Sequence, residues 1–203
     1  PKDKVNASVF AGFKHEFEEL HKLYLECKDN VKFLTTLERH FKAITNYRQV
    51  GDGSLSNVTD VIGPMLNALR MVWIISRHYS DDARMGGLMN RISVEIGDKV
   101  TEDVCVEEIF DIPVDEAIAK VDNAKRLLET WKETYMEVRE KIEMSGNARW
   151  EFNRKELFDR TDYMASICGD LRGMLEAVDG FHHFLGPQLK AVTGENEAID
   201  VVL

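Results

Sequence analysis

The feature that most constrains the fold of this chain is an apolar repeat with spacings of three and four residues. It is clearest at residues 121–142, where it runs without a fault. Such spacing places the apolar side chains on one face of an α-helix. It predicts a helix from Glu116 to Met144, about 43 Å long at 1.5 Å per residue. A helix of this length must bury its stripe against other helices. The stripe consists of Val121, Ala124, Leu128, Trp131, Tyr135, Val138 and Ile142.

The same repeat begins near the start of the chain and then slips by one step, to continue at Leu37, Phe41 and Ile44. A slip of this kind indicates a change of supercoil or a short break. We expect the break at Asp29-Asn30, because both residue types favour caps and turns over helix interiors. The first part of this stripe consists of Phe10, Phe13, Phe17, Leu20, Tyr24, Cys27, Val31 and Leu34.

Three more helices are expected from the apolar pattern and from the residues that mark loops and helix ends. A loop rich in Gly, Ser and Asp covers residues 50–60, and a strongly apolar helix is expected to begin near Asp60 and to be central in the fold. Ser80-Asp81-Asp82 predicts the cap of another helix. The last long helix is expected from about Glu151 to Leu185, ended by Gly186-Pro187.

These elements predict an all-α fold: one or more elongated antiparallel helical bundles built from long amphipathic helices. No alternation of strand type has useful length. We expect a first bundle segment over residues 1–112 and a second segment, a long-helix hairpin, over residues 113–203. Because the chain opens on Pro1 and closes in the apolar run Ala198–Leu203, we expect a segment of a longer protein that continues beyond residue 203.

Charge and composition exclude several partner classes. The chain has 26 Lys and Arg against 36 Asp and Glu, a net charge of −10, which disfavours nucleic acid and other polyanions. Residues 1–50, with nine basic and seven acidic residues, have a net charge of +2; residues 51–112 and 113–203 each have −6. The longest apolar run, Met71–Ile75, is far shorter than the about 20 residues that span a membrane. Three unpaired cysteines indicate reduced thiols in an intracellular protein.

Motifs for catalysis are missing from the sequence. Gly-Lys does not occur, and Gly51-Asp52-Gly53-Ser54 would repel phosphate, so no phosphate-binding loop is expected. No Gly-x-Ser-x-Gly elbow is present. Cys27, Cys105 and Cys168 fall at or near apolar positions and are interpreted as small core residues. Segment-bound cofactors are therefore not expected, and neither is catalysis.

One metal hypothesis stays open. Glu18-x-x-His21 places a carboxylate and an imidazole on one helix face, and Asp179-x-x-His182 repeats the spacing. Two such pairs, together with two more Glu, make the ligand set of a di-metal carboxylate bundle. The alternative interpretation is that His21 lies at the rim of the bundle and that His182 is a hydrogen-bonded core residue. Trp73, Trp131 and Trp150 likewise allow either a partner platform or, for the first two, core packing.

Several stretches together resemble the N-terminal tail of dynein heavy chains, axonemal rather than cytoplasmic, and the outer-arm type in particular. None is a catalytic motif, so the resemblance rests on their number and order, from about residue 9 to the end. The stretches are Phe33–Arg39, Ala68–Tyr79, Asp82–Met85, Trp131–Tyr135, Phe158–Tyr163 and Phe184–Gly194.

The resemblance implies a protein whose function the residues themselves do not show. A dynein heavy chain is an ATP-driven microtubule motor, and its ATPase, with ATP and Mg, lies far beyond the tail. The tail is a series of helical bundles in the cytoskeleton of cilia and flagella. The implied partners are another heavy chain, WD-repeat intermediate chains, light chains and docking proteins on the doublet microtubule. We therefore expect a non-catalytic scaffold segment; the alternatives are the di-metal enzyme and an unrelated helical adaptor.

Overall fold

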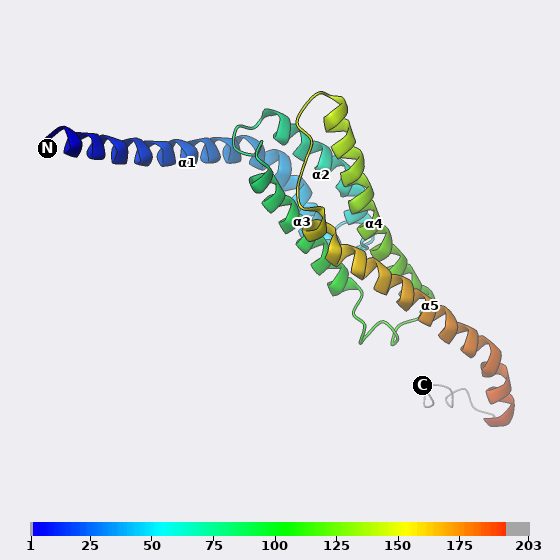
Figure 1. The fold of residues 1–203 in the computed structure, drawn as a ribbon. Helices are drawn as coiled ribbons and strands as arrows, with labels where there is room; N and C mark the ends of the chain where they lie inside the picture. The colour runs from blue at the N-terminus through cyan, green and yellow to red at the C-terminus, as the bar shows by residue number, and fades with distance from the viewer. Residues whose placement is uncertain (1, 194–203) are drawn as a thin grey trace.

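The computed structural model describes residues 2–193, and within them the chain forms five α-helices and one short 3-10 helix. Figure 1 shows an elongated body from which α1 projects at one end and α5 at the other. The elements are α1 (Lys2–Thr45), η1 (Tyr47–Gln49), α2 (Ser56–Ile75), α3 (Asp82–Asp103), α4 (Val114–Met144) and α5 (Arg154–Thr193). The predicted all-α fold with long amphipathic helices is confirmed.

Helix α4 supplies the predicted stripe to the core, and every residue of that stripe is buried. It packs mainly against α5 and α2. The loop between α4 and α5 is fixed to the same core by aromatic side chains. Trp150 is fully buried and stacks on Tyr135, with ring centroids 5.5 Å apart. The indole nitrogen of Trp73 in α2 donates to the carbonyl of Ala148 at 2.7 Å, so α2, α4 and the loop are held together.

Helix α2 is the central helix that the sequence predicts. Seven of its side chains are buried, and it packs against α1 and α4. By length and composition α2 also meets the criterion for crossing a membrane, with a mean hydropathy of 1.3. Its place in the core accounts for this apolar composition, because a helix covered by other helices carries apolar residues on several sides.

Side chains from both predicted segments contribute to one set of packed residues, from Phe33 in α1 to Leu175 in α5. The expected boundary at residue 112 falls in the connection between α3 and α4. The division of residues 1–112 from 113–203 stays a prediction. The expected apolar run Ala198–Leu203 lies outside the described residues.

Three predicted helix limits are wrong. Helix α1 continues through Asp29-Asn30, because their side chains bind the turn between α2 and α3 and leave the backbone of α1 helical. Helix α2 begins at Ser56, with Pro64 inside it, and the amide of Asn67 donates to the carbonyl of Gly63 there. Helix α5 continues past Gly186-Pro187 to Thr193, where the proline removes one backbone donor without ending the helix. The predicted cap at Asp81 is confirmed.

Candidate interaction surface

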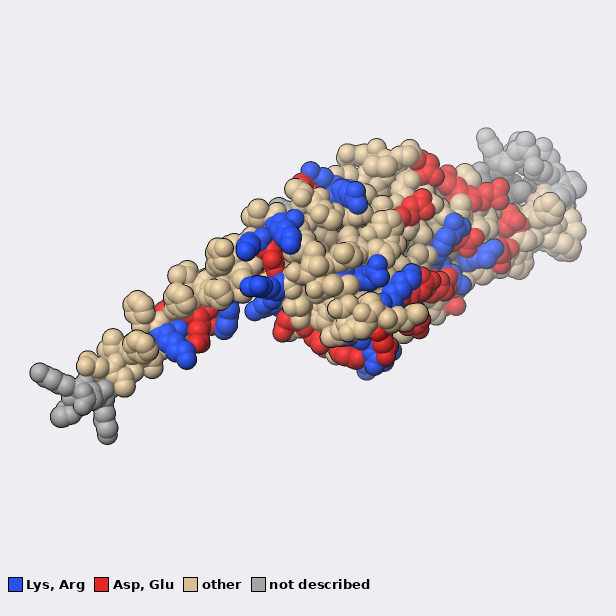
Figure 2. Space-filling view, turned by 90° about the horizontal axis from the view of Figure 1, so that it is seen from above, with Lys and Arg blue, Asp and Glu red and all other residues tan. Residues whose placement is uncertain are grey.

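The first half of α1 projects from the bundle with no other helix around it. Every side chain from residue 6 to residue 24 is exposed, and Figure 1 shows this part of the helix standing free. In Figure 2 uncharged residues cover much of the projecting helix and charged residues gather along one of its sides. An exposed apolar face of this kind marks an interaction site in a soluble protein.

The apolar residues of this half are the ones that the sequence assigns to a helical stripe. Their exposed fractions are 75% for Phe10, 76% for Phe13, 64% for Phe17 and 78% for Val31. Spacings of three and four residues run from Phe10 to Val31 through Leu20, Tyr24 and Cys27, which is the repeat of a coiled-coil seam. We name Phe10, Phe13, Phe17, Leu20, Tyr24, Cys27 and Val31 the α1 seam.

The seam faces away from the bundle. Phe33, Leu37 and Ile44 are buried in the core from the second half of the same helix. Phe17 and Leu37 are 20 positions apart, which corresponds to about 200° around an α-helix at 100° per residue. One continuous helix therefore carries two apolar faces that point in nearly opposite directions. The slip in the repeat between Leu34 and Leu37 is where one face gives way to the other.

Two polar residues in the middle of α1 fix the helix to the turn between α2 and α3. Asp29 is only 8% exposed and accepts hydrogen bonds from the Ser76 hydroxyl and from the backbone amides of Arg77 and His78. The Tyr79 hydroxyl donates to Asn30 at 2.7 Å. These contacts lie beside the projecting part of α1, residues 6–24, which we call the overhang. They therefore set the direction in which the seam projects.

Burial and hydrogen bonding act in opposite directions on the pKa of Asp29. Burial raises the pKa of its carboxyl, while the bonds from Ser76, His78 and Arg77 lower it, and the net result is a pKa below the usual value. Donors to a carboxylate stabilise its charged form. Asp29 is therefore ionised at neutral pH and acts as a charged acceptor for the turn.

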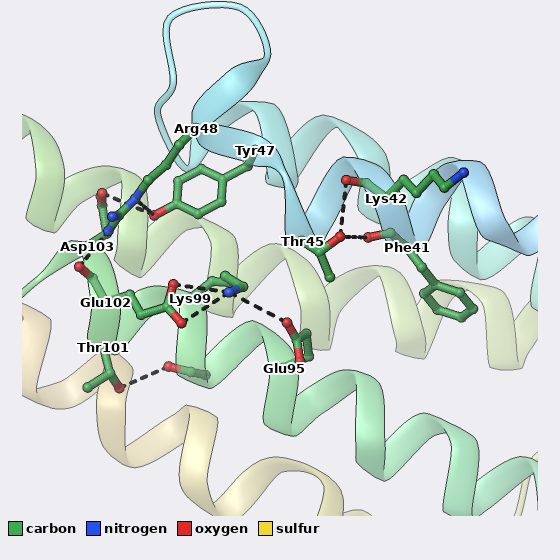
Figure 3. A network of polar contacts seen from close by, with 11 residues as sticks. Phe41, Lys42, Thr45, Tyr47, Arg48, Glu95, Lys99, Thr101, Glu102 and Asp103 are labelled. Atoms are coloured by element: carbon green, nitrogen blue, oxygen red, sulfur yellow. Dashed lines mark hydrogen bonds and ion pairs between the residues drawn. The ribbon is translucent and has the colours of Figure 1, made fainter.

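A second polar network joins η1, just after α1, to the end of α3 (Figure 3). Arg48 donates from Nε to the Tyr47 hydroxyl at 3.0 Å and from Nη2 to the carbonyl of Glu102 at 2.8 Å. The Tyr47 hydroxyl in turn donates to Asp103 at 3.4 Å. Lys99 bridges Glu102 and Glu95 on the surface of α3.

Burial raises the pKa of Asp103, although Lys120, Tyr47 and Arg48 lower it. Burial also raises the pKa of the Tyr47 hydroxyl. The open pocket beside this network has mixed charges, from Arg48 and Lys120 to Glu102 and Asp103. Paired charges of both signs in this arrangement hold η1 to the end of α3.

The structure does not bring the four predicted metal ligands together. Glu18 and His21 are exposed on the α1 overhang, while Asp179 and His182 are exposed on the projecting part of α5, at the other end of the molecule. Within residues 2–193 no group of three or more His, Cys, Asp or Glu side chains is arranged to hold a metal ion. The di-metal hypothesis is wrong for this chain, because both helices overshoot the bundle in opposite directions. His182 is also not a core residue.

The cysteine and tryptophan interpretations have mixed outcomes. Cys168 is buried as expected, and burial raises its pKa to about 11. Cys27 is exposed on the seam and Cys105 is half-buried, so the core interpretation is wrong for Cys27. Trp73 and Trp131 are core residues, and Trp150 is too.

The apolar pattern alone does not identify the seam as a surface, because an apolar stripe looks the same in the sequence whether the protein covers it or a partner does.

Comparison with known proteins identifies relatives over nearly all of the chain. The model of the family described as "Dynein heavy chain, N-terminal region 1" matches residues 3–202. The chain is 54% identical over 197 residues to "Dynein-1-alpha heavy chain, flagellar inner arm I1 complex" of Chlamydomonas reinhardtii, and 47% identical over 199 residues to "Dynein axonemal heavy chain 10" of Homo sapiens. These alignments cover 97% and 98% of this chain and 4% of each relative.

Identity to "Dynein beta chain, flagellar outer arm" of Chlamydomonas reinhardtii is 23% over 190 residues, covering 93% of this chain and 4% of that relative. The identity to the inner-arm relative is thus more than twice as high. The expected outer-arm type is not supported by these values, while the resemblance to axonemal heavy chains is confirmed. The chain spans 4% of the length of these relatives.

Proposed function

This chain belongs to the dynein heavy chain N-terminal region family, and on that premise we propose that it is a non-catalytic scaffold segment in the tail of an axonemal dynein heavy chain. Its work is assembly: it offers a surface on which other parts of the motor complex pack. The ATPase, with its ATP and Mg, belongs to a distant part of the parent chain. The segment acts in the axoneme of cilia or flagella.

The observation that carries this proposal is the α1 seam. Seven seam positions lie on a helix half whose side chains are exposed, opposite the face that the bundle uses. Leaving large apolar side chains in water is unfavourable by roughly 1.5–3 kcal/mol each relative to burial. A segment built in this way gains stability when another helix covers it. The partners that fit are those of a tail: another heavy chain, WD-repeat intermediate chains, light chains or docking proteins on the doublet.

The arrangement of helices also supports a role in transmitting force. Helices α4 and α5 pack as a long hairpin, and α1 and α5 leave the body at opposite ends (Figure 1). A pull along this axis is carried by helices and by a core that includes Trp131 and Tyr135. Contacts formed by interdigitated side chains have low compressibility and therefore pass on displacement.

The chemistry of the described residues supports a non-catalytic role. The buried thiol of Cys168 has a raised pKa and is a poor nucleophile. The thiol of Cys105 also has a raised pKa, through its hydrogen bond to Glu107. The perturbed carboxyls Asp29 and Asp103 each hold two helical elements together. These are structural uses of polar groups.

The test is made in the parent heavy chain, expressed in cells that assemble motile cilia. The variant Phe13→Asp/Phe17→Asp places two charges on the seam, outside every contact with the bundle. We expect normal ATPase activity of the purified motor and loss of the complex from the axoneme. The matched control is Met144→Asp, a change at an 86% exposed position at the end of α4, which we expect to assemble normally. Normal assembly of the seam variant would contradict the proposed function.

A further inference from the structure

The α1 seam has a basic edge along one side. Lys14, His21, Lys28, Lys32 and Arg39 are exposed and follow one another at intervals of seven, seven, four and seven residues. At 100° per residue these positions fall within about 40° of one another around the helix. Four of them border the seam on the same side, while Arg39 continues the row eight residues beyond Val31, and no acidic residue lies among them. In Figure 2 blue basic side chains lie along the projecting helix, with red acidic side chains beside them.

Most of this edge has no acidic partner among the residues that the structure describes. Of its five residues only Lys14 forms an ion pair there, with Glu18 at 3.8 Å. Lys28 and Lys32 lie over the aromatic rings of Tyr24 and Phe33, at 5.9 and 5.0 Å from the ring centroids. The basic edge is therefore available to charges from outside.

The other edge of the seam has a different character. Gly12, Glu16, Leu23 and Asn30 occupy it, so it is nearly neutral, with one carboxylate. In coiled coils the edges beside the seam decide which partner binds and in which direction. Here only the basic edge carries charges of one sign. A helix that covers the seam therefore binds best when it carries negative charges along the side that faces this edge.

From this asymmetry we propose that the α1 seam is covered by an amphipathic helix of a different sequence that carries acidic residues along one edge. The proposal rests on the proposed scaffold function and specifies its partner. Apolar side chains of that helix pack into the seam, and its carboxylates lie opposite Lys14, Lys28 and Lys32. A like-charged helix is disfavoured at the same positions, so the edge also selects against wrong partners.

A second copy of this chain does not have the required chemistry. In an antiparallel pair each basic edge meets the basic edge of the other copy, which is repulsive. In a parallel pair the basic edge meets Gly12, Glu16, Leu23 and Asn30, which offer one carboxylate. A lipid surface is also a poor match, because helices that lie on anionic membranes carry cations across their polar face, whereas Glu18, Glu19 and Glu26 lie on this one.

The test uses the 203-residue chain and two synthetic helical peptides of about four heptads with the same Leu/Ile seam. One peptide has Glu on both edges and the other has Lys. Binding is measured by calorimetry at low and at moderate salt. We expect the Glu peptide to bind at least about tenfold more tightly than the Lys peptide at low salt, with the difference shrinking as salt screens the charges. Lys14→Glu/Lys28→Glu should reverse the preference, and Lys155→Glu, an exposed control on α5, should leave it unchanged.

Equal binding of both peptides, or binding of neither, would overturn the proposal. So would dimers of the chain that dissociate in the Phe13→Asp variant. Binding to phosphatidylserine vesicles that is lost in the Lys14→Glu/Lys28→Glu variant would overturn it as well. Circular dichroism of each variant reports whether the helices are intact. If both peptides bind the seam equally, the charge selection fails while the scaffold function stands. If the seam variant of the heavy chain assembles normally, the scaffold function itself fails.

Discussion

The hydroxyl of Ser76 donates to the carboxylate of Asp29 across 47 positions of the chain, and this bond fixes the turn after α2 to the middle of α1. The same carboxylate caps two backbone amides of that turn. Asp29 is thus a long-range acceptor for three donors of this turn.

Replacing Asp29 with Asn is expected to destabilise the chain. The substitution keeps the size of the side chain but removes its charge and one acceptor oxygen, which leaves donors of the turn poorly paired. Such a loss costs about 1–3 kcal/mol. Urea unfolding measures it, with Asp159→Asn, an exposed position on α5, as the control. Equal midpoints for the two variants would show that the contact contributes nothing.

Stability is expected to fall in acid partly because of this carboxyl. The folded state holds the pKa of Asp29 below its ordinary value, so its contribution is complete above the unfolded pKa of about 3.9 and disappears as the pH falls through the folded pKa. Melting temperatures between about pH 2 and pH 6 report this slope. Asp29→Asn should flatten it, and a curve parallel to that of the parent would exclude Asp29 as a source.

Truncation of the central tryptophan is expected to be severe. Trp131 is fully buried in the α4 stripe, and Trp131→Ala removes its side chain and leaves a cavity, which costs roughly 3–5 kcal/mol. Met144→Ala, at the exposed end of the same helix, serves as the control. Thermal unfolding followed by circular dichroism gives both values. A Trp131→Ala variant that melts within about a degree of the parent would refute the assigned stripe.

Two adjacent glycines in α3 are expected to respond differently to alanine. A Cβ at Gly87 would meet nothing within 4 Å, whereas a Cβ at Gly86 would lie 3.3 Å from the ring of Phe152. Gly87→Ala should therefore stabilise the helix by up to about 1 kcal/mol. Gly86→Ala should give a smaller gain or a loss, since Phe152 packs against Trp150 and Tyr135. Chemical denaturation of both variants decides the order.

Thiol labelling is expected to separate the cysteines. Cys27 is exposed, while burial raises the pKa of Cys168 to about 11. At about pH 8 a reagent that reacts with thiolates should therefore modify Cys27 in the native chain and Cys168 only after unfolding. Mass spectrometry of the labelled peptides identifies each site. Simultaneous labelling in native buffer would mean that the packing of α5 against α4 and α3 does not cover Cys168.

Apolar spacing predicted much of this architecture because it reports the face of a helix directly. The stripe from Val121 to Ile142 follows from spacing and the cap at Asp81 from its residue type, and both are confirmed. Spacing carries no information on what covers a face. Spacing therefore does not distinguish Phe10 and Phe13 from core residues, and it interprets the slip before Leu37 as a change of supercoil or a short break. The break predicted at Asp29-Asn30 is wrong for a related reason. Both side chains do bind a turn, but it is the turn between α2 and α3, 47 or more positions away, and not one in their own helix.

Helix α1 is one continuous α-helix of 44 residues, which corresponds to about 66 Å of helix axis at 1.5 Å per residue. Because the seam and the core face share this one rod, a partner on the seam and the bundle below it have no linker to absorb relative movement. A tilt of the bundle by about 10° moves the tip of an overhang about 30 Å long by roughly 5 Å. The overhang thus behaves as a lever arm, and small rearrangements in the core become large displacements at its far end.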